Sequence, residues 1–518
     1  MKFEIKNKYL IFPVNSLATS KELFFKKNDE TLYHLYVKID NINPTFYAYI
    51  DVSRFLGECL DISVDPEIEL VISQSDEMNI KNIYNEPMRP QIHFSTKNGW
   101  INDPNGLIYL DGVYHMFYQH NPADSNWGNM HWGHAESFDL IHWEEKDIAL
   151  FPDERGAMYS GCAVFDNNNL IGKNIGEDNV ALLFYTTTNP FCQHVSYSTD
   201  HFKTIKRLCK DPVIPHIIEF NRDPKVVYCN ELGCYIMILY LRKDEYCIFK
   251  SSDLIDWIQL QTLQLKGDCE CPDIFPLYDD QGVRKWVVMG AHDKYIVGNF
   301  DEGKFIAEQE EQSLHYGGSA YAGQSFNNLP NGRIVRMVWD RWGLPAVNFK
   351  GQMGIPMEMS IGKSGDIYYL EANPIQEIEK LIKTKEVFHN LEINDEKYFS
   401  TAIKQGPQLI KIKSKMYDYG RLSIKIFGRS IDVDYNKNEI KLGNYIAPIS
   451  LNKNDFNITI VVDICSMELF IDGGKIFLSC LDNNTLADFN IPHLSISSNS
   501  EISLDSLEIN SLNSIWNR

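Results

Sequence analysis

Short apolar runs that alternate with polar positions fill most of the 518-residue chain, and Gly, Asn and Asp interrupt them. Alternation with a period of two is typical of β-strands, whereas apolar positions three and four residues apart indicate helices. Residues 107–118 predict a hairpin whose two strands flank Asp111 and Gly112. Helical spacing is convincing only over residues 374–387. The pattern therefore predicts an all-β protein with one short helix.

A faint internal repeat orders these strands. The sequence SFDLIHW at 137–143 matches SSDLIDW at 251–257, and a degraded copy, STDHFKT, lies between them at 198–204. Repeats at this spacing suit the four-stranded blades of a β-propeller. We therefore expect a propeller in the middle of the chain.

The flanks of the repeat region differ from it. The first 88 residues contain strand-like pieces, and the chain after residue 388 alternates strongly, as a β-sandwich does. Either flank could also form a contact between copies of the chain. The sequence predicts four segments: an N-terminal β-rich accessory domain (1–88), a propeller (89–373), a linker helix (374–387) and a C-terminal β-sandwich (388–518).

Charge and composition limit the classes of molecule that the protein is expected to bind. A formal net charge of −21 disfavours nucleic acids and anionic membranes, whereas a neutral ligand such as a sugar meets no repulsion. The first residues carry scattered charges where a signal peptide needs an apolar run. The 11 cysteines are odd in number and lack disulfide-scaffold spacing. We therefore expect a reduced, cytoplasmic setting.

Three carboxylates stand at similar places in successive units, where an apolar strand begins. Asp103 and Asp223 each precede a proline, and Glu270 lies two residues before one. A lone Asp-Pro is usually a plain turn. The innermost strands of a propeller line its axis, so residues repeated in phase with the blades converge there. We therefore expect these three carboxylates to share one funnel and to act in catalysis.

A pair of carboxyl groups is what cleavage of a glycosidic bond requires. One group protonates the leaving oxygen; the other attacks the anomeric carbon directly, with retention of configuration, when the two lie about 5–5.5 Å apart. Cys269, Cys271 and Pro272 flank Glu270, and a partly apolar setting keeps a carboxylic acid protonated near neutrality. Glu270 is therefore the candidate acid.

Three motifs resemble the signatures of glycoside hydrolase family 32, the invertases, levanases and inulinases: WINDPNG at 100–106, RDP at 222–224 and EC at 270–271. They occur in the family's order and at its approximate separation. FYQ at 117–119, WGNMHWGH at 127–134 and YSG at 159–161 extend the resemblance, which covers the chain from about 90 to 345. The family's fold, a five-bladed propeller followed by a β-sandwich, agrees with the repeats.

The resemblance implies a role for each matching residue. Asp103 would be the nucleophile that attacks the fructosyl C2, and Glu270 the general acid and then the base that activates water. Asp223 would stay ionised, hold sugar hydroxyls and stabilise the transition state. Arg222 is expected to pair with a catalytic carboxylate. The implied substrate-binding residues are Asn102, Gln119, Trp127, Tyr159, Ser160, Arg222 and Trp342.

Some positions depart from the family's pattern and leave the substrate open. Tyr159 stands where the family often has Phe. His315-Tyr-Gly317 replaces a more usual Asp-Tyr-Gly, which removes a carboxylate expected in the pocket wall. The register of the late tryptophan motif at 339–342 is also open, and the first 88 residues lie outside the family's minimal architecture.

The sequence predicts neither a metal nor a cofactor, because the expected reaction uses only carboxylates and water. His131 and His134 could be metal ligands, but structural histidines fit better because no third ligand is in reach by sequence. Trp127 lies in a Gly- and Asn-rich stretch that suits stacking on a sugar, whereas Trp143 suits the core.

The expected function is that of a retaining, exo-acting β-fructofuranosidase, which hydrolyses terminal fructosyl units of sucrose, fructo-oligosaccharides, levan or inulin. Fructosyl transfer from the same covalent intermediate and a non-catalytic carbohydrate-binding propeller stay open as alternatives. An inverting arabinan- or xylan-directed enzyme fits the 100–106 motif poorly. A phosphorylated sugar would need a cationic site, and residues 90–345 contain no dense cluster of Lys and Arg.

Overall fold

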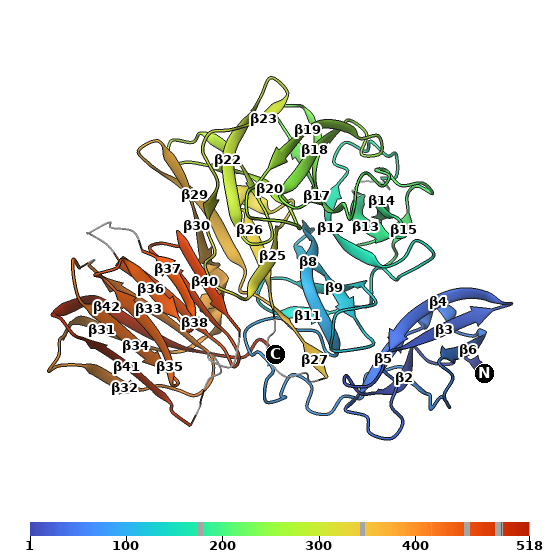
Figure 1. Ribbon diagram of the computed structural model, residues 1–518, viewed down its shortest axis with the longest axis horizontal. Helices are drawn as coiled ribbons and strands as arrows, with labels where there is room; N and C mark the ends of the chain where they lie inside the picture. The colour runs from blue at the N-terminus through green and yellow to red at the C-terminus, as the bar shows by residue number, and fades with distance from the viewer. Residues whose placement is uncertain are drawn as a thin grey trace.

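The computed structural model describes residues 1–174, 180–341, 348–415, 417–449, 456–481, 488 and 490–516. Strands make up almost all of the regular structure in these residues (Figure 1). Their helices are three short 3-10 turns, η1 (Ser53–Phe55), η2 (Pro330–Gly332) and η3 (Gln376–Leu381). None of the three has the length and apolar character needed to cross a membrane. The all-β prediction is confirmed.

Five sheets follow one another along the middle of the described chain. The first contains β8 (Gly99–Leu110), β9 (Val113–Asn121), β10 (His131–Ser137) and β11 (Trp143–Glu145). The second contains β12 (Met158–Phe165), β13 (Ala181–Thr188), β14 (Phe191–Ser198) and β15 (Lys206–Arg207). The third contains β16 (Arg222–Cys229), β17 (Cys234–Arg242), β18 (Glu245–Ser251) and β19 (Ile258–Gln264).

The fourth and fifth sheets each carry one short extra strand. The fourth contains β20 (Asp273–Tyr278), β21 (Arg284–Met289), β22 (Lys294–Asp301) and β23 (Lys304–Ala307), with β24 (Gln312–Ser313) beside β22. The fifth contains β25 (Ala320–Ser325), β26 (Val335–Asp340), β29 (Met357–Ser364) and β30 (Ile367–Pro374), with β28 (Gln352–Met353) beside β26.

The first strands of the five sheets form a ring. β8 contacts β12, β12 contacts β16, β16 contacts β20, β20 contacts β25, and β25 contacts β8 again. A further link comes from β27 (Phe349–Lys350), which pairs in parallel with the start of β8, Phe349 opposite Gly99. A segment late in the chain thus joins the first sheet, and side chains at the starts of the ring strands face one another.

Residues 2–75 form two further sheets beside the first sheet of the ring (Figure 1). Apolar side chains of both sheets, such as Phe12, Phe25 and Ile62, share a buried cluster with Ala123 of the ring region. The strands are β1 (Lys2–Glu4), β2 (Tyr9–Val14), β3 (Lys21–Lys27), β4 (Glu30–Val37), β5 (Phe46–Asp51), β6 (Cys59–Asp65) and β7 (Ser73–Ser75).

The C-terminal residues form two six-stranded sheets around their own apolar core. One sheet contains β31 (Ile382–Ile393), β42 (Ile502–Leu512), β33 (Gln408–Ser414), β38 (Phe456–Val462), β39 (Met467–Ile471) and β40 (Ile476–Cys480). The other contains β32 (Phe399–Ala402), β41 (His493–Ser498), β34 (Arg421–Ile426), β35 (Arg429–Asp434), β36 (Glu439–Leu442) and β37 (Tyr445–Pro448).

The predicted linker helix at 374–387 is wrong in type and extent. Only η3 is helical there, and Ile382 already begins β31. β31 pairs with β42 from Ile382 to Ile393, so its backbone groups bond across the sheet instead of within a helix. The β-branched side chains of Ile382, Thr384 and Val387 also favour a strand.

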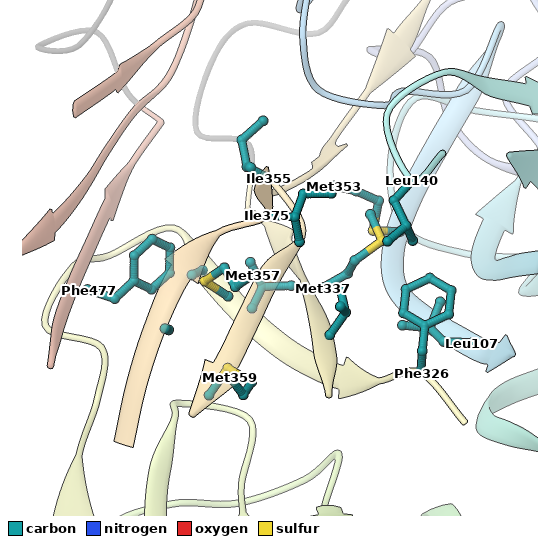
Figure 2. Close-up of a cluster of buried hydrophobic side chains, with 14 of the residues drawn as sticks. Leu107, Leu140, Phe326, Met337, Met353, Ile355, Met357, Met359, Ile375 and Phe477 are labelled. Atoms are coloured by element: carbon teal, nitrogen blue, oxygen red, sulfur yellow. The ribbon is translucent and has the colours of Figure 1, made fainter. Parts of the chain in front are cut away.

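Apolar packing joins the C-terminal sheets to the ring. Phe470 and Phe477 belong to the same buried cluster as Met357 and Met359 of β29. Figure 2 shows part of this cluster, with Phe477 of β40 at one end and Leu107 of β8 at the other. The ring and the C-terminal sheets therefore share a core.

A buried histidine pairs with two carboxylates at the same junction. His93 Nδ1 lies 2.8 Å from Asp463 Oδ2, and His93 Nε2 lies 3.3 Å from Glu468 Oε2. Burial alone would lower the pKa of His93, but the two carboxylates outweigh burial and raise it to about 10. The cation therefore links the segment before β8 to the C-terminal sheet.

We expect the His93 ion pairs to stabilise the fold in a pH-dependent way. The folded protein holds the proton more tightly, so the stabilisation is complete below the ordinary pKa of 6.5 and is lost as pH rises through about 10. The slope cannot exceed about 1.4 kcal/mol per pH unit. Urea unfolding of wild type and His93→Gln across this range should show a difference that shrinks as pH rises. A difference that stays constant, or the same trend in the exposed control His389→Gln, would contradict this role.

Candidate active site

A pocket of about 420 Å³ lies where the five sheets meet; four of the sheets contribute strand residues to its wall, and Glu270 enters it from the turn that precedes β20. The structure brings together every predicted site residue that it describes; Trp342 lies outside the described residues. The pocket is lined by Asn102, Asp103, Gln119, Trp127, Tyr159, Ser160, Phe191, Phe220, Arg222, Asp223, Glu270, Tyr321 and Trp339.

Irregularities in the ring strands aim these side chains into the pocket. The register of β8, β12, β16 and β25 shifts at 101–104, 159–161, 222–225 and 321–324 respectively. Such bulges bend a strand and turn a side chain out of the regular alternation. Asp223 and Glu270 also have positive φ angles of 65° and 54°, a strained backbone often found at functional sites.

Asp103 accepts hydrogen bonds from two neighbouring side chains. Ser160 Oγ donates to Asp103 Oδ2 at 2.6 Å, and Asn102 Nδ2 donates to Asp103 Oδ1 at 3.1 Å. Trp100 Nε1 in turn orients the Asn102 side chain at 2.7 Å. Burial raises the pKa of Asp103, while these hydrogen bonds oppose the rise.

Cys271 connects Asp103 to Asp223. Its thiol lies 3.5 Å from Oδ2 of both aspartates, and its backbone N–H donates to Asp223 Oδ2 at 3.1 Å. Burial is the main cause that raises the pKa of Asp223 to about 7; Arg222 opposes this rise, and the charges of Asp103 and Glu270 add to it. Asp223 therefore changes charge near neutral pH.

Glu270 meets polar partners rather than the apolar setting expected from its neighbours in sequence. Arg222 Nη2 donates to Glu270 Oε1 at 2.5 Å, and Tyr321 Oη donates to Glu270 Oε2 at 2.7 Å. The Glu270 side chain is 33% exposed. Arg222 Nε also lies 3.6 Å from Asp223 Oδ2, so one guanidinium serves two carboxylates, as the expected pairing required.

Aromatic rings form a continuous rim along one side of the pocket. Trp127 and Tyr159 meet edge to face at 6.1 Å, Tyr159 and Phe191 at 5.8 Å, and Phe191 and Phe220 at 5.3 Å. Trp127 is 58% exposed, which leaves its ring face available to a ligand. Apolar ring faces next to carboxylates suit the C–H faces and hydroxyls of a sugar.

Four wall residues were not among the predicted ones. Phe191, Phe220 and Tyr321 lie on segments without a motif, so nothing in the local sequence marks them as pocket residues. Trp339 belongs to the late tryptophan motif, whose register was open in sequence. Of that motif, the structure places Trp339 in the pocket.

Two expectations about histidines change. His315 is not a pocket-wall residue: it packs against Phe477 at 5.1 Å between ring centroids, and burial lowers its pKa to about 3. His134 does have potential metal-ligand neighbours, because pairing of β9 with β10 brings His115 and Glu136 to it. His115 Nδ1 and His134 Nε2 lie 3.1 Å apart, which one shared proton explains as a structural pair.

Carboxylates that face one another beneath an aromatic rim are the groups that a glycoside hydrolase needs to bind and cleave a sugar. The comparisons agree: residues 93–372 match the glycosyl hydrolases family 32 N-terminal domain. A levanase of Bacillus subtilis (strain 168) is 28% identical over 506 residues, which cover 86% of this chain and 74% of that protein. A fructan beta-fructosidase of Streptococcus mutans serotype c is 31% identical over 348 residues, 61% of this chain but only 24% of that protein.

Solved structures give the same result for the fold. The exo-inulinase from Aspergillus awamori matches with a TM-score of 0.74 and 23% identity, over 84% of this chain and 100% of that chain. This likeness shows the β-propeller and β-sandwich architecture of the family's structures. The chain belongs to glycosyl hydrolase family 32, which confirms the predicted family and the predicted class of enzyme.

We expect the charge of Arg222 to set the pH at which Asp223 ionises. Because Arg222 lowers the pKa of Asp223, Arg222→Gln should raise that pKa above its present value of about 7. The acidic limb of kcat/KM against pH should then move to higher pH, while Arg222→Lys, which keeps the charge, should move it less. An acidic limb that stays in place in Arg222→Gln would show that Asp223 is not the group that titrates there.

Proposed function

We propose that this chain is a retaining, exo-acting β-fructofuranosidase that hydrolyses terminal fructosyl units of sucrose, fructo-oligosaccharides, levan or inulin. The meeting of Asp103, Asp223 and Glu270 in one pocket carries the proposal. Four of the five sheets and the turn before β20 contribute to the pocket wall, and a funnel of this kind supports attack on the end of a chain rather than on its middle. The names of the relatives, levanase and fructan beta-fructosidase, support a fructoside as substrate.

The fold supports this function through its ring. We interpret the five sheets as the five blades of a propeller at 89–373, with the C-terminal sheets as the sandwich at 388–518. The ring of contacts from β8 through β25 and back to β8 supports that interpretation. The sheets of residues 2–75 are then the accessory domain at 1–88.

Asp103 acts as the nucleophile in the first step. Its Oδ2 is occupied by the Ser160 hydroxyl and the Cys271 thiol, whereas Asn102 is the hydrogen-bond partner of Oδ1. Oδ1 therefore keeps the freer lone pair for attack on the fructosyl C2. The glycosidic oxygen leaves with a proton from Glu270, and an ester between the sugar and Asp103 remains.

Glu270 acts as acid first and as base second. Arg222 and Tyr321 each donate to one of its oxygens, which holds the carboxyl group in place for proton transfer in both steps. Water that has lost its proton to Glu270 attacks C2, the ester bond to Asp103 breaks, and fructose leaves. The proton now on Glu270 serves the next leaving group, so the cycle is balanced.

Asp223 and Arg222 hold the sugar and stabilise the transition state. Asp223 accepts the Cys271 N–H and donates its own backbone N–H to Thr186 Oγ1 at 3.0 Å, which fixes its position. An ionised carboxylate at this place binds sugar hydroxyls and favours the positive charge that develops on the fructosyl ring. The guanidinium of Arg222 holds the carboxyl groups of Asp223 and Glu270 in place.

Fructosyl transfer is the second candidate, because the same ester can give its sugar to a hydroxyl other than water. The exposed Trp127 at the rim is the observation that supports an acceptor site there. Product analysis at high sucrose concentration separates the two: hydrolysis gives free fructose equal to glucose, and transfer gives less fructose and longer oligosaccharides.

We expect the purified protein to release fructose from one or more of sucrose, 1-kestose, inulin and levan. Glu270→Gln removes the general acid and base while keeping the shape, so kcat should fall by about 10²- to 10⁴-fold. The exposed Glu310→Gln is a matched control and should retain activity. Fructose release that survives Glu270→Gln would exclude Glu270 as the acid, and no release from any of the four substrates by wild type would end the fructosidase proposal.

A covalent intermediate on Asp103 is the signature of retention. In Glu270→Gln, a fructoside with a leaving group that needs no protonation should still react, but the ester should hydrolyse slowly because the base is missing. Intact-protein mass spectrometry should then show one added fructosyl unit, which peptide mapping places on Asp103. The double variant with Asp103→Asn should show none. A reaction that proceeds without any adduct would favour an inverting mechanism.

A further inference from the structure

A groove of about 630 Å³ separates the N-terminal sheets from the ring. Strand β4, the edge strand of its sheet, supplies one wall through residues such as His34 and Tyr36. The other wall consists of Pro152, Asp153, Glu154, Gly156, Ala157 and Thr188. We call this space the β4 groove; nothing in the fructosidase reaction described above uses it.

The same segments line both the β4 groove and the catalytic pocket. Ala157 lines the groove, and Tyr159, two residues later, lines the pocket; Thr188 lines the groove, and Phe191, three residues later, lines the pocket. Ala157 N donates to Thr188 Oγ1 at 2.9 Å, which ties the two segments together at the groove. The groove therefore adjoins the outer side of the aromatic rim.

Two backbone contacts fix the N-terminal sheet to this rim. Tyr36 N donates to Asn129 Oδ1 at 2.8 Å, and Asn129 Nδ2 donates to Tyr36 O at 2.7 Å. Asn129 lies two residues after Trp127 in the same loop. The side-chain amide of Asn129 thus pairs with β4 as a further strand would, and β4 is held in a set position beside the Trp127 loop.

Three aromatic rings lie together on the N-terminal sheet, and two of them, His34 and Tyr36, line the β4 groove. Phe24 and His34 are opposite one another on β3 and β4 and stack at 4.6 Å, and His34 contacts Tyr36 at 5.0 Å between ring centroids. Tyr36 is 52% exposed. A row of rings of this kind, partly open to water, suits stacking against successive sugar units.

The charges in the groove favour a neutral ligand. Of the described residues that line it, none is Lys or Arg. Asp153 is paired with Arg155 at 2.6 Å and with Arg207 at 3.0 Å, and Glu154 with Arg207 at 3.1 Å. Carboxylates held in place this way accept hydrogen bonds from hydroxyls, and because arginines already balance their charge, a neutral ligand brings no unpaired charge into the groove.

We propose that the β4 groove is a second carbohydrate-binding site, which holds neutral fructosyl units of an oligo- or polyfructoside whose terminal unit occupies the catalytic pocket. The shared wall segments, the fixed β4 strand and the exposed ring of Tyr36 carry this assignment. The N-terminal sheets thereby make the enzyme select longer chains over sucrose. This inference rests on the proposed function for its substrate class.

The test compares chain lengths in a groove variant. Tyr36→Ala removes the ring but leaves the backbone contacts to Asn129. We expect kcat/KM for sucrose to be unchanged and kcat/KM for inulin or levan to fall roughly two- to tenfold, the effect of one lost aromatic contact. The control is Tyr47→Ala, since Tyr47 is 54% exposed on β5, outside the groove lining, and should change neither value.

Three kinetic results would contradict a sugar site in the β4 groove. These are an unchanged kcat/KM on the long substrates, an equal loss of kcat/KM on sucrose and on long substrates, or an equal loss in Tyr47→Ala. A change of oligomeric state in Tyr36→Ala, followed by size-exclusion chromatography, would show instead that this face binds a second copy of the chain and would also overturn it. Inulin binding by Asp103→Asn, measured calorimetrically with and without Tyr36→Ala, is independent of turnover. If inulin binding depends on Tyr36 but the wild type hydrolyses no fructoside, the proposed function is wrong and the sugar-binding role of the β4 groove still stands.

Discussion

Three carboxylates in one partly buried pocket repel one another, and the arrangement of the site follows from how Arg222 offsets that repulsion. Its guanidinium reaches Glu270 at 2.5 Å and Asp223 at 3.6 Å, and its own backbone stands next to Asp223 on β16. The Cys271 N–H donates to Asp223 as well, and the Cys271 thiol lies against Asp103, which the guanidinium does not reach. Burial raises the pKa of both aspartates, and Arg222 opposes that rise at Asp223, so the two carboxyl groups are set differently for acid–base chemistry.

The sequence predicted the centre of the site better than its rim. Asp103 and Asp223 lie near the starts of ring strands and Glu270 lies just before one, so a repeated local pattern marks all three in the sequence. Tyr321, which donates to Glu270, has no such mark, because its role depends on a contact between sheets. The apolar setting expected for Glu270 failed for the same reason: its neighbours in sequence are not its neighbours in space.

The fold class was predictable because strand alternation is a local property, whereas segment 374–387 shows the limit of local patterns. Its apolar spacing fits a helix, yet pairing with β42 offers its backbone a complete set of partners in a sheet. His134 is a similar case, since its neighbours His115 and Glu136 arrive through the pairing of β9 with β10. Long-range pairing decides both, and no single window of sequence contains it.

The parallel pairing of β27 with β8 bears on the order in which the protein is made. Gly99 lies at the start of the strand that carries Asp103. Its backbone N–H donates a hydrogen bond to Asn348 O, and it pairs with Phe349. During synthesis this partner of the first ring strand is made only after all three catalytic carboxylates. The strand that carries Asp103 therefore gains its full set of backbone partners late, once the chain has passed Phe349.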